Sequence, residues 1–64
     1  MIIRNIETGT LYHLLALSRE KGMKARNLET GQIMQGYFTD MEYFRKEDMP
    51  LEKAVMLSRE RWQP

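Results

Sequence analysis

The sequence predicts a small α+β fold, in which an antiparallel β-meander of two hairpins precedes one C-terminal α-helix. Three observations predict this fold. The segment Arg4–Gly9 recurs as Arg26–Gly31 with one conservative difference, and both copies end like a tight turn. Apolar side chains flank each copy at spacings that suit strands. From Pro50 onward the apolar residues follow a helical spacing instead.

Each copy of the repeat has the residues of a hairpin turn. The first three residues of Leu28–Gly31 suit a type I turn, and the glycine supplies the positive φ that a following bulge requires. The same reasoning applies to Ile6–Gly9. A three-residue Glu-Thr-Gly loop predicts these cross-strand pairs: Leu28 with Gln32, Asn27 with Ile33, Ala25 with Gln35, Met23 with Tyr37, Asn5 with Leu11, Ile3 with His13 and Met1 with Leu15.

These registers divide the strand residues between two faces, because side chains alternate along a strand. The better core face gathers Met1, Ile3, Leu11, Leu15, Met23, Ala25, Ile33 and Tyr37. The other face also carries apolar side chains, so it needs cover from curling, from a helix or from a partner. We expect four or five strands, curled in the manner of an SH3-type barrel.

The segment Thr10–Gly22 has two interpretations. Leu11, Leu14 and Ser18 keep a helical spacing, and Gly22 would end a helix. Periodicity alone does not assign so short an apolar run. The repeat favours a strand followed by a turn at Ser18–Gly22, because the first copy should fold as the second does. The alternative fold has a helix over residues 10–21, packed on a three-stranded sheet.

The last segment predicts a helix over about residues 50–62. Pro50 suits the first turn of a helix, where its missing N–H removes no hydrogen bond. An amphipathic stripe, which should cover the second face of the sheet, consists of Leu51, Ala54, Val55, Ser58 and Trp62. Before this helix, Tyr43-Phe44 is expected to add a short strand. The chain is thus predicted to be one domain over residues 1–64, β-rich over residues 1–45.

Composition argues against catalysis, cofactors and metal sites. The chain has no cysteine, so neither a disulfide nor a thiolate metal site forms. His13 is the only histidine, and its neighbours Tyr12 and Leu14 supply no activated nucleophile. We therefore expect no enzyme and no cofactor. Ten basic and nine acidic residues nearly cancel, and the apolar runs are short, which predicts a cytoplasmic protein without a membrane segment.

Methionine content indicates a surface that binds another protein. Six methionines in 64 residues is a high proportion, and flexible thioethers suit adaptable binding surfaces. We therefore predict a non-catalytic binding or regulatory module that acts through a protein partner, of a size that suits an accessory or inhibitor protein of a phage or mobile element. A homodimer is a further expectation, because so short a chain buries a small core. The expected contacts are Met34, Tyr37, Tyr43, Phe44 and Met56.

The alternative function is single-stranded nucleic-acid binding through a basic and aromatic sheet face. Rings stack on bases and cations meet phosphates in such sites. The predicted registers place Arg4, Lys24 and Arg26 on one face with Tyr12. The residues expected to bind nucleic acid are Arg4, Lys24, Arg26, Tyr12, Arg45 and Lys46. The nearly neutral total charge falls short of the strongly basic surface typical of such proteins.

Overall fold

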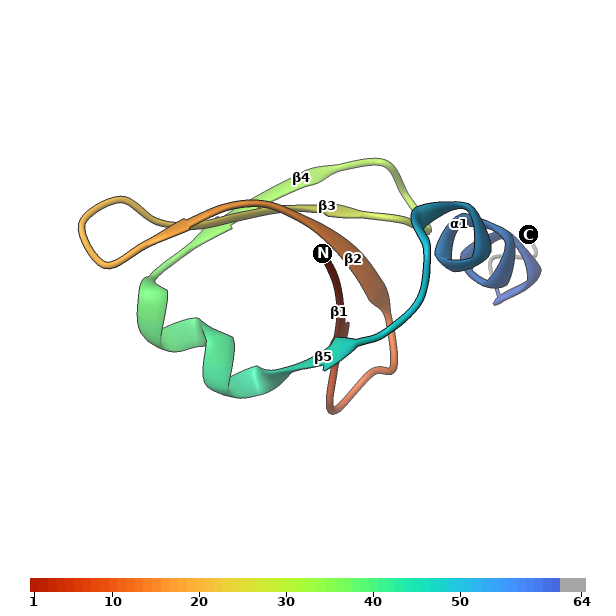
Figure 1. The fold of residues 1–64 in the computed structure, drawn as a ribbon, viewed down its shortest axis with the longest axis horizontal. Helices are drawn as coiled ribbons and strands as arrows, with labels where there is room; N and C mark the ends of the chain where they lie inside the picture. The colour runs from red at the N-terminus through yellow and green to blue at the C-terminus, as the bar shows by residue number, and fades with distance from the viewer. Residues whose placement is uncertain (62–64) are drawn as a thin grey trace.

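The computed structural model describes residues 1–61, which form a five-stranded antiparallel sheet and one C-terminal helix (Figure 1). The small α+β fold predicted from the sequence is confirmed. The elements are β1 (Ile2–Asn5), β2 (Leu11–Ser18), β3 (Gly22–Asn27), β4 (Ile33–Gly36), the 3₁₀ helix η1 (Phe38–Tyr43), β5 (Phe44–Glu47) and α1 (Leu51–Arg61).

The sheet is open and strongly curled. Its strand order is β4-β3-β2-β1-β5, so that β4 and β5 form its two edges. Figure 1 shows β3 and β4 on one side of the fold, β1 and β5 on the other, and η1 crossing from one side to the other. In the described residues no strand pairing joins β4 to β5, and the expected barrel is therefore curled but not closed.

β2 is a strand, as the repeat favours, and the helical alternative for residues 10–21 is wrong. A turn follows β2, in which the Ser18 hydroxyl accepts a hydrogen bond from the N–H of Lys21 at 2.9 Å. Gly22, with φ of 83°, then starts β3. The hairpin is held by its pairing with β3, and this tertiary pairing outweighs the local helical spacing of the leucines.

A bulge bends β2 near its middle. Leu14 pairs with Ala25 but Ala16 pairs with Lys24, which leaves Leu15 as an extra residue in β2. Bulges bend a strand and increase its twist, and this one lies where the sheet curls. The prediction that Leu15 faces the core is wrong: Leu14 packs into the interior instead, and Leu15, at the bulge, is exposed.

Both repeat turns have four-residue loops, and the predicted three-residue loop is wrong. In the second copy the N–H of Asn27 donates to the carbonyl of Gln32 at 2.8 Å, and the N–H of Gly31 donates to the carbonyl of Asn27 at 2.7 Å. The Asn27 side chain also accepts the backbone N–H groups of Glu29 and Thr30. Because Asn27 closes the loop, Leu28 is one of the loop residues and is not paired across the hairpin. Every predicted pair therefore shifts by one residue.

The first copy repeats this geometry. The N–H of Asn5 donates to the carbonyl of Thr10 at 2.9 Å, and the N–H of Gly9 donates to the carbonyl of Asn5 at 2.8 Å. The Asn5 side chain accepts the N–H groups of Glu7 and Thr8. The glycines Gly9 and Gly31 have φ of 75° and 80°, as the turn prediction requires. The repeat is therefore a hairpin turn used twice.

The interior of the curl holds one of two apolar clusters. Its buried residues are Ile3, Met23 and Ala25, as predicted, with partly buried Tyr12, Leu14, Met34, Met41 and Phe44 packed against them. Met1, Ile33 and Tyr37, predicted in the core, are exposed instead. Ile33 pairs with Arg26 rather than Asn27, and this shift of one residue moves its side chain to the outer face.

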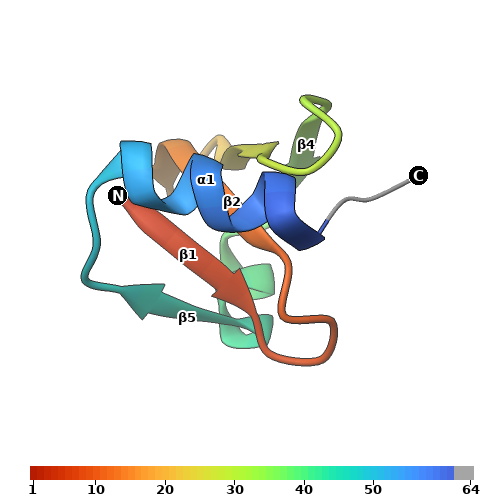
Figure 2. The same cartoon turned by 90° about the vertical axis from the view of Figure 1, so that its right-hand side faces the viewer.

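The second cluster lies beneath α1 at one end of the sheet. Ala54 is buried against Ile2 and Leu11, and Figure 2 shows α1 in front of β2 and beside β1. The helix covers this end of the sheet rather than the whole outer face, and Leu51 of the predicted stripe is exposed. Ser58 is also buried. Trp62, the last residue of that stripe, lies outside the described residues.

Candidate partner-binding groove

A groove of about 280 Å³ lies against the edge strand β4 and the junction of η1 with β5. We call it the edge groove, and its lining residues are Asn5, Glu7, Met23, Met34, Gln35, Gly36, Asp40, Tyr43 and Phe44. These residues come from β1, the β1–β2 turn, β3, β4, η1 and β5. The curl of the sheet therefore brings together segments that are far apart in the sequence.

The floor of the edge groove is the apolar interior of the curl. Met23 is buried, whereas Met34 and Phe44 pack against it from the two opposite edge strands. The Phe44 ring meets the Tyr12 ring edge-on, with centroids 5.5 Å apart and an angle of 87° between the rings. This geometry is favourable for aromatic pairs and fixes Phe44 toward the interior. An apolar side chain entering the groove would extend this cluster.

Hydrogen bonds hold the wall formed by η1 at both of its ends. At the start, the Asp40 carboxylate accepts the backbone N–H of Tyr37 at 2.7 Å. At the end, the carbonyl of Tyr43 accepts the N–H of Ile6 at 2.9 Å, which ties η1 to the β1–β2 turn. The wall is thus capped locally at its start and bonded to the first turn at its end.

The edge groove is acidic. Its lining includes Glu7 and Asp40, and no lysine or arginine is among these described lining residues. The neighbouring Glu42 carboxylate raises the pKa of Tyr43 above 10.0, first by hydrogen bonding to the phenol and second by its charge. The single phenol proton of Tyr43 is thus directed to Glu42, and the hydroxyl oxygen keeps its capacity to accept a hydrogen bond.

Three of the five residues predicted from the sequence to bind a partner line the edge groove. They are Met34, Tyr43 and Phe44, which the sequence separates but the curl brings together. Tyr37 is 79% exposed and lies outside the lining, immediately after β4. Met56 is 63% exposed on α1, and it too lies outside the groove. The structure therefore divides the predicted contacts between separate surfaces.

Sequence reasoning missed the polar lining residues Asn5, Glu7, Gln35 and Asp40. Asn5 and Glu7 belong to the first copy of the repeat, and the second copy has the same residue types. Nothing in the repeated motif therefore distinguishes the copy that lines a groove. The distinction arises because η1 is bonded to the first turn.

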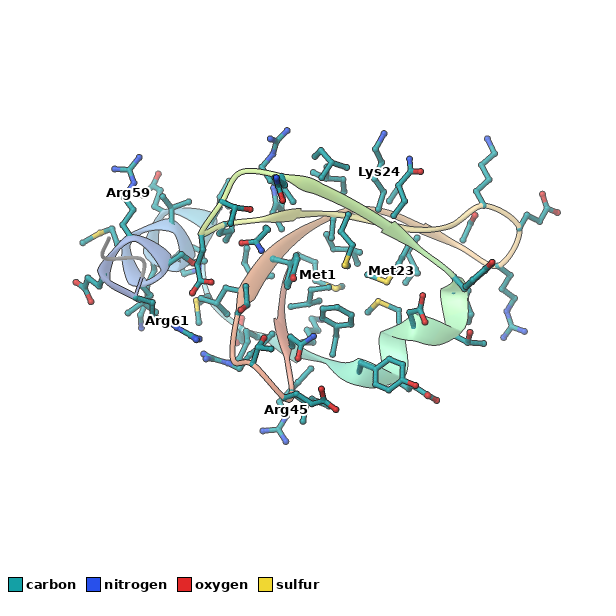
Figure 3. All side chains as sticks on the ribbon, turned by 180° about the vertical axis from the view of Figure 1, so that it is seen from behind. Met1, Met23, Lys24, Arg45, Arg59 and Arg61 are labelled. Atoms are coloured by element: carbon teal, nitrogen blue, oxygen red, sulfur yellow. The ribbon has the colours of Figure 1, made fainter. Side chains whose placement is uncertain are left out.

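The predicted nucleic-acid residues do not form one basic surface. Lys24 and Arg45 point away from opposite sides of the fold in Figure 3, because the sheet between them is curled. Arg4 forms an ion pair with Glu47, with Nε and Oε1 2.5 Å apart. Arg26 donates to the carbonyl of Gly31 at 3.0 Å, as part of the turn. Arg4 and Arg26, two of the cations expected to bind nucleic acid, are thus engaged within the protein.

Tyr12, the aromatic residue expected beside these cations, does not share a face with them. Tyr12 pairs with Ile3 in the sheet and packs into the interior cluster, so the prediction that it shares a face with Arg4 is wrong. The shift of one residue in the first hairpin causes this change of face. Lys46 pairs with Ile3 from the edge strand β5 and is exposed.

A larger hollow, of about 470 Å³, lies along the β2–β3 hairpin. Its lining includes Lys21 and Lys24. The small residues Ala16, Ser18, Gly22 and Gly36 also line it and offer little side chain for a ligand to contact. It contains none of the residues predicted to contact a partner. We therefore place the candidate site at the edge groove, which has both an apolar floor and polar walls.

The described residues contain no group of three histidine, aspartate or glutamate side chains placed to hold a metal ion. His13 lies in β2 between Ile2 of β1 and Arg26 of β3. Neither neighbour is a nucleophile or a carboxylate that could orient the imidazole. Within residues 1–61, no helix combines the length and the apolar character needed to cross a bilayer.

The chain matches no protein-family model, no curated protein and no solved structure. The chemistry of the edge groove is therefore the basis for assigning a function.

Proposed function

We propose that this domain is a non-catalytic binding module, which acts in the cytoplasm by engaging a protein partner through the edge groove. The supporting observation is the convergence of Met34, Tyr43 and Phe44 on one groove from different elements. Apolar and aromatic side chains at a concave site, together with a few placed polar groups, are typical of binding sites. Tyrosine in particular supplies a large contact area and a polar hydroxyl.

Tyr43 is the residue on which to test this proposal. Its side chain is about half exposed and lines the groove, so its truncation removes a contact without opening the buried cluster. We expect Tyr43→Ala to weaken partner binding about tenfold or more, as truncated tyrosine contacts often do. The partner would be captured with the tagged full chain and its affinity measured by calorimetry.

Met56→Ala is the matched control. Met56 is more exposed than Tyr43 and lies on α1, outside the groove. Binding should survive this change, and circular dichroism should show both variants folded. Equal binding of the wild-type chain and Tyr43→Ala would exclude the edge groove as the contact surface. Loss of binding in Met56→Ala alone would move the site to α1.

Single-stranded nucleic-acid binding is the second candidate. Its support is the exposed cations of Lys24, Arg26, Arg45 and Lys46. If it is correct, the chain should bind an oligonucleotide with an affinity that falls steeply as salt rises. The double variant Arg4→Ala with Arg26→Ala should then lose this binding. No binding to single-stranded RNA or DNA at low salt would rule out this candidate.

A further inference from the structure

The two edge strands of the sheet differ in how well they are protected against pairing with another strand. β5 has the sequence Phe44-Arg45-Lys46-Glu47, so charged side chains occupy three of its four positions. β4 has the sequence Ile33-Met34-Gln35-Gly36 and carries neither a charge nor a proline. Charged residues on an edge strand hinder the addition of another strand. Only β4 therefore lacks this barrier to pairing.

The hydrogen-bond pattern identifies the free backbone groups of β4. The N–H of Asn27 donates to the carbonyl of Gln32, which makes this pair a hydrogen-bonded one. Hydrogen-bonded and non-bonded pairs alternate along an antiparallel ladder. The N–H and C=O groups of Ile33 and Gln35 therefore point away from β3, toward the open edge. An added strand would pair with these groups.

The edge groove lies directly beside this edge. Met34, Gln35 and Gly36 of β4 are part of its lining, together with Glu7 of the first turn and Asp40, whose carboxylate lies beside Gly36. A strand beside β4 would lie about 4.8 Å from it and would point alternate side chains to opposite faces. One of its side chains would therefore enter the groove, toward the apolar floor.

Building on the proposed binding function, we infer that the edge groove takes an extended basic segment of the partner protein. This segment pairs with the free edge of β4 and places an apolar side chain on Met34 and Phe44. Two positions along, on the same face, it brings a lysine or arginine to Glu7 and Asp40. Backbone pairing then supplies affinity, and the groove and its carboxylates supply specificity, as in other cases of strand addition.

Charge favours this occupant over a second copy of the chain. β4 of a second copy has no cation to place near Glu7 and Asp40. A pairing of two β4 strands would therefore leave the carboxylates of both grooves without a partner charge. A segment with an apolar and a basic residue two positions apart, on the same face of the strand, meets both the apolar floor and the carboxylates.

The probe is a short capped peptide in which valine and lysine occupy every second position in turn, with threonine between them, so that both face the groove. It is added to the full ¹⁵N-labelled chain and followed by NMR. We expect shift changes at Met34, Gln35 and Tyr43, and slower hydrogen exchange at the amides of Ile33 and Gln35. A valine–glutamate peptide of the same length should leave the spectrum unchanged. A valine–lysine peptide with N-methylated backbone should also fail, because it lacks the N–H donors for pairing.

Glu7→Gln is the matching variant of the protein. It removes a groove charge but keeps the size of the side chain, and we expect it to weaken peptide binding about threefold, in the range of an exposed ion pair. Glu20→Gln, in the turn between β2 and β3, is the control and should bind as the wild-type chain does.

Each alternative outcome has a defined meaning. Equal binding of the lysine and glutamate peptides, or of Glu7→Gln and the wild-type chain, would overturn the basic occupant. Binding of the N-methylated peptide without protection of Ile33 and Gln35 would overturn strand addition. A dimer in sedimentation that Ile33→Lys dissociates would assign β4 to a second copy. If no peptide binds while Tyr43→Ala still abolishes capture of a partner, this inference fails and the proposed function stands.

Discussion

At the scale of single residues, the repeated motif is explained almost completely by its turn. In both copies the arginine donates to the glycine carbonyl, at 3.3 Å in the first copy and at 3.0 Å in the second. The asparagine closes the loop, and the threonine hydroxyl accepts the N–H two residues later. The glycine supplies a positive φ. The motif therefore recurs because the same turn recurs, and of its two copies the first also lines the edge groove, through Asn5 and Glu7.

Glycines of similar φ should differ sharply in their tolerance of alanine. Gly31 has open space where a Cβ would lie, so Gly31→Ala should cost only the strain of the left-handed backbone, about 1–2 kcal/mol. A Cβ at Gly22 would lie 2.2 Å from the carbonyl oxygen of Gly36. Gly22→Ala should therefore displace β4 as well and unfold most of a domain this small.

Urea denaturation followed by circular dichroism checks this pair. Gly31→Ala should show a cooperative transition at lower urea, whereas Gly22→Ala should lack a folded baseline. Equal midpoints for the two variants would contradict the close packing of Gly22 against β4.

At the scale of elements, one side chain attaches α1 to both repeat turns. Arg61 donates to the carbonyl of Thr8 at 2.9 Å, and its Nε lies 3.2 Å from Oε1 of Glu29. Glu29 is mostly buried, and its other oxygen accepts the hydroxyl of Thr10 at 3.4 Å. The last described turn of the helix is thereby fixed to the end of the sheet. This contact also gives the Glu29 of the repeat a role that Glu7 does not share.

Arg61→Ala should lower the free energy of unfolding by about 0.5–1 kcal/mol, because the ion pair is partly exposed and solvent screens it. Arg59→Ala, two residues earlier on the same helix, should have little effect, since Arg59 is exposed and Figure 3 shows it pointing away from the sheet. A double-mutant cycle with Glu29→Ala measures the coupling by urea denaturation. Additive effects of Arg61→Ala and Glu29→Ala would show that the ion pair contributes nothing.

At the scale of the whole molecule, the two apolar clusters should differ in their stability. The interior cluster is enclosed by all parts of the curled sheet and by η1. The cluster beneath α1 depends on Ala54 and on partly buried side chains around it, and a helix of 11 residues is marginal in isolation. The helix end of the molecule should therefore open before the sheet does.

Native-state hydrogen exchange tests this order. Amides of α1 near Val55 should exchange faster than the paired amides of β2 and β3 near Leu14 and Ala25, because local opening of the helix leaves the interior cluster intact. Arg61→Ala should accelerate exchange in α1 and leave the exchange of β2 unchanged. Equal protection of helix and sheet would mean that they open together.

Local chemistry explains which parts of the fold and site were predictable. The turns follow from asparagine, threonine and glycine at fixed positions, and the helix follows from Pro50 and an apolar stripe. Among the groove residues, Met34 was found because a methionine outside the expected core suits an adaptable binding surface. The carboxylates Glu7 and Asp40 were missed, because their nearness to β4 depends on the curl and not on any local pattern.

The tetrapeptide Leu-Ser-Arg-Glu separates what the sequence determines from what the tertiary structure decides. It occurs at Leu17–Glu20, where it ends β2 and begins a turn, and again at Leu57–Glu60 inside α1. By itself the sequence determined the hairpin turns, the strands beside them and the terminal helix, because these follow from neighbouring residues. The one-residue register is also local, because the asparagine side chain closes a four-residue loop. Only the tertiary structure decided the bulge at Leu15 and the edge groove, because each depends on contacts between segments that are distant in the chain.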